Sequence, residues 1–357
     1  MTPLARRIAG EIAAHGPISV ARFMELALTA PELGYYMTRD PFGAEGDFTT
    51  APEISQMFGE MIGLWAVVTW ESMGRPEPFV LAELGPGRGT LMADALRAAR
   101  LRPEFLAAAR IALVEASPAL RARQKTTLAG HAPEWFAAFD ELPGGPMILI
   151  ANEFFDALPI RQFVRSQGVW RERRVGAAGE GFRFVAGDAA KDEALPADAP
   201  EGAIAERGVA GERLAAAIGA RVAQNGGAAL IVDYGHGASA VGATLQAVRA
   251  HDYADPLADP GSADITAHVD FGAIARAARA AGAAVHGPVG QGWFLAALGI
   301  ARRAERLAAD KDAKAREVIE LALKRLIAPS EMGNLFKAMV VADARLGVPA
   351  GFEPSAA

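Results

Sequence analysis

A glycine-rich segment, FVLAELGPGRGTL (79–91), carries the first residues whose types and spacing could do chemistry. It places Glu83 just before three closely spaced glycines, Gly85, Gly87 and Gly89. Glycine tolerates positive φ and lets the backbone approach a ligand closely, while the N-terminus of a following helix favours an anionic group. The segment therefore predicts a ligand-binding loop, with a plain tight turn as the alternative.

The same loop argues against a ligand rich in phosphates. Dinucleotide-binding folds need G-x-G-x-x-G, whereas Thr90 stands here where the third glycine would fall. Pro86 lacks an N–H group that a pyrophosphate could use, and no Gly-Lys-Ser/Thr follows. We therefore expect a ligand without phosphates.

A second carboxylate points to the ligand. Glu115 follows the apolar run RIALV, and an acid at this strand end can accept both hydroxyls of a ribose. Glu83 could hold the amino group of an amino-acid tail. An adenosine that carries such a tail is S-adenosylmethionine, so we expect this cofactor, with S-adenosylhomocysteine as its product. Taken alone, Glu115 could equally be an exposed strand-end acid.

Two further apolar runs end in polar residues. Asn152, Glu153 and Asp156 follow PMILIA, and Asp233 and Tyr234 follow AALIV. Paired carboxylates such as Glu153 and Asp156 suit a guanidinium acceptor of a methyl group, because they can hold it by bidentate hydrogen bonds. The alternative for residues 152–156 is a helix cap beside two buried phenylalanines.

Other polar residues give weaker signals. His236 and His268 could act as acid or base, but a loop histidine is more often an ordinary polar residue. The Asp-rich segment 255–271 could fold near the same site or form a solvated loop that ends in a helix cap at Asp270. Thr50 and Glu53 have the spacing of a capping box, so the loop before them is pinned at one end and could line a site.

The elements that must position these residues alternate between apolar runs and helical stretches from residue 79 onwards. This pattern predicts an α/β fold with a doubly wound parallel sheet. We expect a helical N-terminal cap over 1–75 and the main domain over 76–357, with an antiparallel β insertion at about 160–225. An amphipathic helix over about 301–327 and a last strand in LFKAMVVADA complete the pattern.

Composition excludes several classes of protein. The 51% hydrophobic content provides for a large core, and 36 Lys plus Arg against 42 Asp plus Glu lack the charge of a nucleic-acid binder. The absence of cysteine excludes disulfides, thiolate metal sites and a cysteine nucleophile, and the six histidines show no ligand pattern, so we expect no metal. The longest apolar run, 57–70, is interrupted by Gly and Glu, so we expect no membrane insertion. No signal or transit peptide is recognisable, and we expect a cytoplasmic, bacterial protein.

Several long segments together resemble the MidA family. They are FGAEGDFTTAPEISQMFGEMIGLW, ELGPGRGTLMADALR, LVEASPALR, ANEFFDALPIRQF, DYGH, TLQAVRAHDYADPLADPGSADITAHVDF and QGWFLAALGI. The mitochondrial members of that family are protein arginine methyltransferases needed for respiratory complex I assembly, and the resemblance covers nearly the whole chain. It implies a Rossmann-like, seven-stranded methyltransferase fold that uses S-adenosylmethionine.

The resemblance also implies an activity and roles for residues. The activity is symmetric dimethylation of an arginine in a core complex I subunit, or in a bacterial equivalent, which would be the protein partner. Gly85, Gly87 and Gly89 match the cofactor loop, Glu115 the ribose site, and Glu153 the strand end that faces the acceptor. In GDFTTAPEIS, we expect Asp47, Thr49 and Thr50 to close over the methionine end of the cofactor while Thr50 caps the next helix.

Three other interpretations stay open at this point. The acceptor could be a different amine or an amide, although NEFFD lacks the Asn-Pro-Pro-aromatic arrangement associated with amide methylation. The chain could be a non-catalytic assembly factor that binds the cofactor, and a nicotinamide-dependent oxidoreductase is more distant. Periodicity also leaves open whether the apolar helices of residues 1–75 pack on the core or on a second copy in a homodimer.

Overall fold

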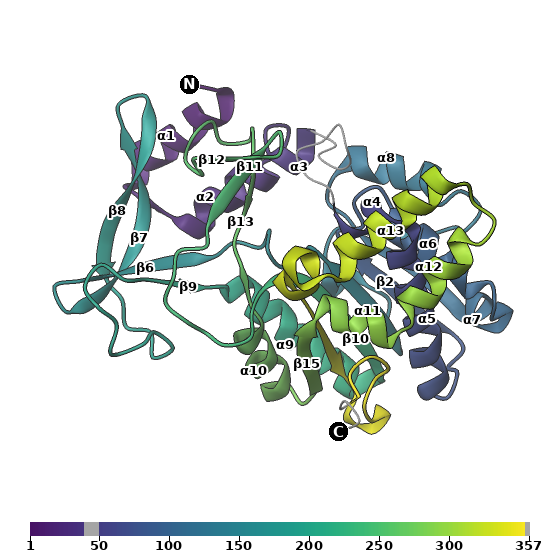
Figure 1. Ribbon diagram of the computed structural model, residues 1–357. Coiled ribbons are helices and arrows are strands. Elements are labelled where there is room, and N and C mark those ends of the chain that lie inside the picture. The colour runs from purple at the N-terminus through teal and green to yellow at the C-terminus, as the bar shows by residue number, and fades with distance from the viewer. Residues whose placement is uncertain (39–49, 354–357) are drawn as a thin grey trace.

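A large mixed sheet forms the centre of the protein in the computed structural model, which describes residues 1–38 and 50–353 (Figure 1). Its strands follow the order β15-β16-β10-β5-β2-β3-β4. They are β2 (Phe79–Leu84), β3 (Ala109–Val114), β4 (Glu134–Phe136), β5 (Met147–Asn152), β10 (Gly227–His236), β15 (Ala284–Gly290) and β16 (Phe336–Ala342). β16 runs antiparallel to both of its neighbours, whereas β2, β3, β4, β5 and β10 are parallel. The short β14 (Val269–Asp270) also pairs with β10, so the described sheet has eight strands, one more than expected.

Successive residues of the central strands face two different cores. In β2, Leu81 packs in one core, while Val80 and Ala82 pack in the other. Every residue of β2 and of β5 is buried. A strand that is covered on both faces must be apolar throughout, which is why the sequence shows continuous apolar runs here.

Helices cover both faces of this sheet. On one face lie α5 (Gln56–Ser72), α6 (Thr90–Ala99), α7 (Pro103–Ala108), α11 (Gln291–Ala297), α12 (Ile300–Ala308) and α13 (Ala313–Ile327). On the other lie α9 (Val209–Asn225) and α10 (Phe271–Ala280). The apolar side chains of α5 and α9 thus contribute to the main cores, although the expected boundaries assign α5 to the cap and α9 to the insertion. The division into a cap of residues 1–75 and an insertion at about 160–225 stays a prediction.

A second, antiparallel sheet is built mainly from residues within 160–225. It contains β1 (Ile18–Ser19), β6 (Arg161–Ser166), β7 (Val169–Ala178), β8 (Gly181–Ala189) and β9 (Ile204–Arg207). Helices α1 (Pro3–His15) and α2 (Val20–Thr29) pack on it, with Ile8, Phe23 and Val175 in one core. A third sheet, of β11 (Gln246–Arg249), β12 (Asp252–Ala254) and β13 (Asp264–Thr266), joins the same core and lies between the other two sheets (Figure 1).

Short helices complete the chain. They are α3 (Tyr35–Thr38), α4 (Ala51–Ile54), α8 (Pro118–Thr127), η1 (Phe139–Glu141), η2 (Pro329–Gly333) and η3 (Ala344–Leu346). The single helix expected over about 301–327 is two helices, α12 and α13. The break occurs because Asp312 caps the start of α13 and accepts a hydrogen bond from the Ala315 N–H at 2.8 Å.

Candidate active site

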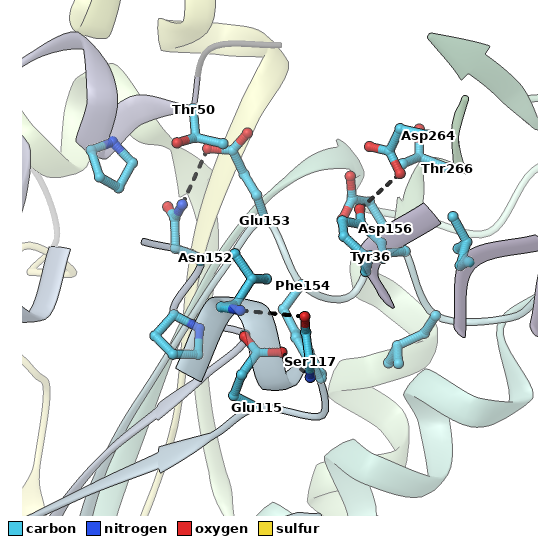
Figure 2. A pocket seen from close by; sticks show the side chains of 18 of the residues that line it. Tyr36, Thr50, Glu115, Ser117, Asn152, Glu153, Phe154, Asp156, Asp264 and Thr266 are labelled. Carbon is cyan, nitrogen blue, oxygen red and sulfur yellow. Dashed lines mark hydrogen bonds between the residues drawn. The ribbon is translucent and has the colours of Figure 1, made fainter. Parts of the chain in front are cut away.

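A cavity of about 700 Å³ lies at the carboxyl ends of β2, β3, β5 and β10. The chain pairs β3 on one side of β2 and β5 on the other, so the cavity lies where the strand order reverses. Open α/β sheets bind their ligands at such a point. Most residues of the segments 83–90 and 114–117 line one part, which we call the glycine-loop half. Residues 152–154 and 156–158, with Tyr36, Tyr234, Asp264, Thr266 and His268, line the other, the carboxylate half. Figure 2 shows several of them, among them Tyr36, Asp156 and Asp264.

The glycine loop has a backbone that other residues adopt only at a cost. Gly85, Gly87 and Gly89 have φ angles of 58°, 54° and 82°, in the left-handed region that disfavours side chains. A Cβ atom added at Gly85 would also lie 2.7 Å from Cδ2 of Phe154. The left-handed backbone therefore favours glycine at all three positions, and glycine at position 85 also leaves room for the Phe154 ring.

Two buried carboxylates flank this loop. Glu83 is 3% exposed, and its Oε2 atom has no hydrogen-bond partner among the described residues. Burial, and secondly the charge of Glu115, raises the pKa of Glu83 to about 8. The oxygens of Glu115 accept hydrogen bonds from the Ser117 N–H at 2.8 Å and from Gln124 Nε2 at 3.1 Å. Gln124 also donates to the Gly87 carbonyl at 2.7 Å and so joins Glu115 to the loop.

The hydrogen-bonding capacity of these two carboxylates fits S-adenosylmethionine. The orphaned oxygen of Glu83 can accept a hydrogen bond from an amino group, and each carboxylate oxygen of Glu115 has lone pairs to spare for ribose hydroxyls. Sequence reasoning missed Gln124, because it lies within a polar helix and only the fold brings it beside Gly87.

The segment before α5 contributes to both halves. Thr50 lines the cavity and occupies the N-cap position of α4, but its side chain makes no capping hydrogen bond, so the expected capping box is wrong. Glu53 instead accepts a hydrogen bond from the Thr90 hydroxyl at 2.6 Å and lies 3.8 Å from Arg88 Nη1. The Glu53 carboxylate therefore interacts with Thr90 and Arg88 of the glycine-loop half instead of completing a capping box at Thr50. The expected contacts of Asp47 and Thr49 lie outside the described residues.

Asn152, Glu153 and Asp156 all line the cavity beyond the end of β5, with Glu153 beside Asn152 and Thr50 and with Asp156 apart from them, beside Tyr36 and Asp264 (Figure 2). Glu153 has a φ of 50° and accepts hydrogen bonds at Oε1 from the Ala51 N–H at 3.0 Å and from Asn152 Nδ2 at 3.1 Å. Burial raises the pKa of Glu153 to about 7. Burial also raises the pKa of Asp156 to about 6, against a hydrogen bond from Tyr234 that lowers it. Asp156 Oδ1 has no hydrogen-bond partner in the described part of the chain.

The far wall of the carboxylate half comes from distant segments. The Tyr36 hydroxyl donates to Asp264 Oδ1 at 2.7 Å, and Figure 2 shows both side chains beside Asp156. Tyr234 forms hydrogen bonds with Asp156 and Thr266. Sequence reasoning missed Tyr36, because no local motif marks it. It left the segment of Asp264 either near the site or in solvent, and the structure places Asp264 in the cavity wall.

The two candidate histidines lie in different positions. His268 lines the cavity with its ring edge-on to Tyr234, 5.4 Å between centroids, and burial lowers its pKa. His236 lines a separate cavity of about 260 Å³. Within residues 1–38 and 50–353, no group of three or more His, Asp or Glu residues is placed to hold a metal ion. In the same ranges, no helix has the length and apolar character that a bilayer crossing requires.

Comparison with known proteins identifies the family. Residues 61–289 match the model of a family described as "Putative S-adenosyl-L-methionine-dependent methyltransferase". The chain is 37% identical to the protein arginine methyltransferase NDUFAF7 homolog, mitochondrial, of Drosophila melanogaster, over 94% of this chain and 83% of that protein. It is 35% identical to the protein arginine methyltransferase NDUFAF7, mitochondrial, of Homo sapiens, over 94% and 82%.

A solved structure agrees with both the fold and the cofactor. A COG1565 superfamily member from Burkholderia thailandensis, bound to S-adenosyl-homocysteine, superposes with a TM-score of 0.85 at 30% identity. The match covers 98% of this chain and 92% of that one. The cytoplasmic location expected from the sequence is contradicted, because these curated relatives are mitochondrial proteins. The chain belongs to the MidA family of methyltransferases, and S-adenosylmethionine is its cofactor.

Proposed function

We propose that this protein methylates an arginine side chain of a protein substrate, with Glu153 and Asp156 orienting the guanidinium. The observation that carries the proposal is the pair of buried carboxylates in the same cavity as the glycine loop. Neither carboxylate forms an ion pair with a Lys or Arg residue in the described ranges. Because burying an uncompensated carboxylate is costly, a cationic acceptor suits this half of the cavity.

The chemistry divides between the two halves. When bound, S-adenosylmethionine supplies an electrophilic methyl group. Glu153 and Asp156 then hold the guanidinium by hydrogen bonds, so that one of its terminal nitrogens faces the glycine-loop half. The two carboxylates draw the positive charge of the guanidinium toward the carboxylate half. With pKa values of about 7 and 6, these carboxylates can accept the proton that the nitrogen loses near neutral pH.

The finer activity is part of the same proposal. We infer symmetric dimethylation of an arginine in a core subunit of complex I or its bacterial equivalent. The resemblance of the long sequence motifs supports this acceptor, and the names of the relatives support arginine as the residue type.

Mass spectrometry tests the proposal directly. The purified protein is incubated with S-adenosylmethionine that carries a deuterated methyl group and with a recombinant core complex I subunit of the same organism. We expect deuterated methyl groups on arginine, with the fragmentation pattern of the symmetric isomer. Glu153→Gln should lower the transfer rate roughly 100-fold, in the range of a lost acid–base group, while S-adenosylhomocysteine affinity stays within about twofold.

The matched control is Glu104→Gln, which changes an exposed glutamate on α7 in the same way. Unchanged transfer by Glu153→Gln would refute its role, and methyl groups on lysine or on an amide would refute arginine. A protein that binds S-adenosylhomocysteine but transfers nothing, while Glu153→Gln supports normal assembly in cells, would be a non-catalytic assembly factor.

A further inference from the structure

One fully buried carboxylate lies behind the site and takes no part in lining the cavity. Asp233 is 0% exposed and lies within β10, one residue beyond the last position that pairs with β5. Its Oδ2 atom accepts hydrogen bonds from three successive backbone N–H groups, those of Phe154, Phe155 and Asp156, at 3.2, 3.0 and 3.2 Å. Its Oδ1 atom accepts one from the Tyr234 N–H at 2.9 Å. A single side chain therefore binds the whole turn that follows Glu153.

The register of the sheet explains why the turn needs this partner. Val232 of β10 pairs with Asn152 of β5, and the Glu153 N–H donates to the Val232 carbonyl at 2.8 Å. Beyond this point the ladder ends, and Glu153 turns into the left-handed region with a φ of 50°. The next three N–H groups then have no strand to pair with, and buried N–H groups without partners are strongly disfavoured. Asp233, one residue beyond the last paired position, satisfies all three.

We propose that Asp233 is a positioning residue, which fixes the turn between Glu153 and Asp156 and thereby aims both carboxylates into the cavity. The inference rests on the proposed function, since it assigns these two carboxylates to the acceptor. This role is more than structural, because the three N–H groups that Asp233 binds belong to the two residues between Glu153 and Asp156 and to Asp156 itself.

The contacts of Glu153 agree with this role. A left-handed conformation is unfavourable for glutamate and persists only where surrounding groups hold it. The Glu153 side chain is held from one side by the Ala51 N–H and Asn152 Nδ2. On the other side of Glu153, Asp233 accepts a hydrogen bond from the N–H of the next residue, Phe154. Without Asp233, the backbone can relax out of this conformation, and the two carboxylates lose their fixed separation.

Asp233→Asn tests the proposal without changing the shape of the side chain. Its amide keeps one oxygen but replaces the other by an NH2 group, which must face either the three N–H donors or the Tyr234 N–H. We expect hydrogen exchange of the amides of Phe154, Phe155 and Asp156 to become at least about tenfold faster in this variant. The kcat for methylation of the recombinant complex I subunit should fall roughly tenfold, and S-adenosylhomocysteine affinity should stay within about twofold. Asp233→Ala should lower kcat further.

The matched control is Asp343→Asn. Asp343 is also buried and accepts a hydrogen bond from a backbone N–H, that of Arg345 at 3.0 Å, but it lies at the other edge of the sheet. This variant should lose thermal stability without losing transfer. Unaltered exchange at residues 154–156 in Asp233→Asn would overturn the proposal, and so would faster exchange with unaltered kcat. If the wild-type protein methylates no arginine, the proposed function fails, while the exchange rates still show whether Asp233 holds the turn.

Discussion

The two halves of the cavity are built in different ways. The glycine-loop half comes mainly from two strand-to-helix connections, residues 83–90 and 114–117. The carboxylate half combines the turn after β5 with Tyr36 from α3, Tyr234 from β10 and Asp264 from β13. Tyr36 and Asp264, which share a hydrogen bond, are separated by 228 positions in the chain. A local motif can therefore specify the glycine-loop half, whereas the carboxylate half depends on the packing of two sheets and helix α3.

This difference predicts separable functions. Changes in the glycine-loop half should act on cofactor affinity, and changes in the far wall of the carboxylate half should act on transfer. Two substitutions test that separation, and a third tests the ionisation of a carboxylate in the glycine-loop half.

Gly85→Ala should have the largest effect, on cofactor binding. The new methyl group meets Phe154 at 2.7 Å, and alanine is strained at a φ of 58°. Strain and displacement of about 3 kcal/mol together would weaken S-adenosylhomocysteine binding roughly 100-fold in isothermal titration. Gly144→Ala is the control, because a Cβ atom there meets nothing within 4 Å. Equal affinities for the two variants would show that the loop does not form the cofactor site.

Tyr36→Phe should have an intermediate effect, on transfer only. It removes the hydroxyl that donates to Asp264 at 2.7 Å and leaves a buried carboxylate without that donor. A hydrogen bond to a charged group contributes about 1.5–3 kcal/mol, so kcat/KM for the protein acceptor should fall at least about tenfold. Tyr253→Phe, on an 81% exposed tyrosine at the mouth of the cavity, should change little. A loss of cofactor affinity in Tyr36→Phe would contradict the separation of the two halves.

Glu83→Gln should have the smallest effect, on the pH dependence of stability. The pKa of Glu83 is raised to about 8 by burial and by the charge of Glu115, from an ordinary value of 4.5. A raised carboxyl pKa favours the folded state below the ordinary value, and this contribution is lost as the pH rises toward about 8. The Tm of the cofactor-free protein should therefore fall between pH 5 and 8 by at least about 2 °C more in the wild type than in Glu83→Gln. Parallel Tm curves would show that Glu83 ionises normally.

The sequence predicted the parallel strands because their two-sided burial leaves continuous apolar runs. It likewise predicted the glycine loop, and it placed Glu153 and Asp156 at a strand end, because these residues are neighbours in the chain. Gln124 and Tyr36 could not be found in this way, because tertiary packing brings Gln124 from α8 to the glycine loop and Tyr36 from α3 to the cavity wall. The capping box failed for the same reason, since Glu53 accepts a hydrogen bond from Thr90, which is 37 positions away.

The length of β5 is constrained as tightly as its composition. Ile148 packs in one core and Leu149 in the other, and the strand pairs with β2 and β10 on its two sides. Deleting one residue would exchange the two cores along the strand and draw Glu153 into the ladder, because a shift by one position reverses every side chain. Homologues should therefore tolerate substitutions in this strand far better than insertions or deletions. Insertions and deletions should be confined to the loops at the opposite edge of the sheet.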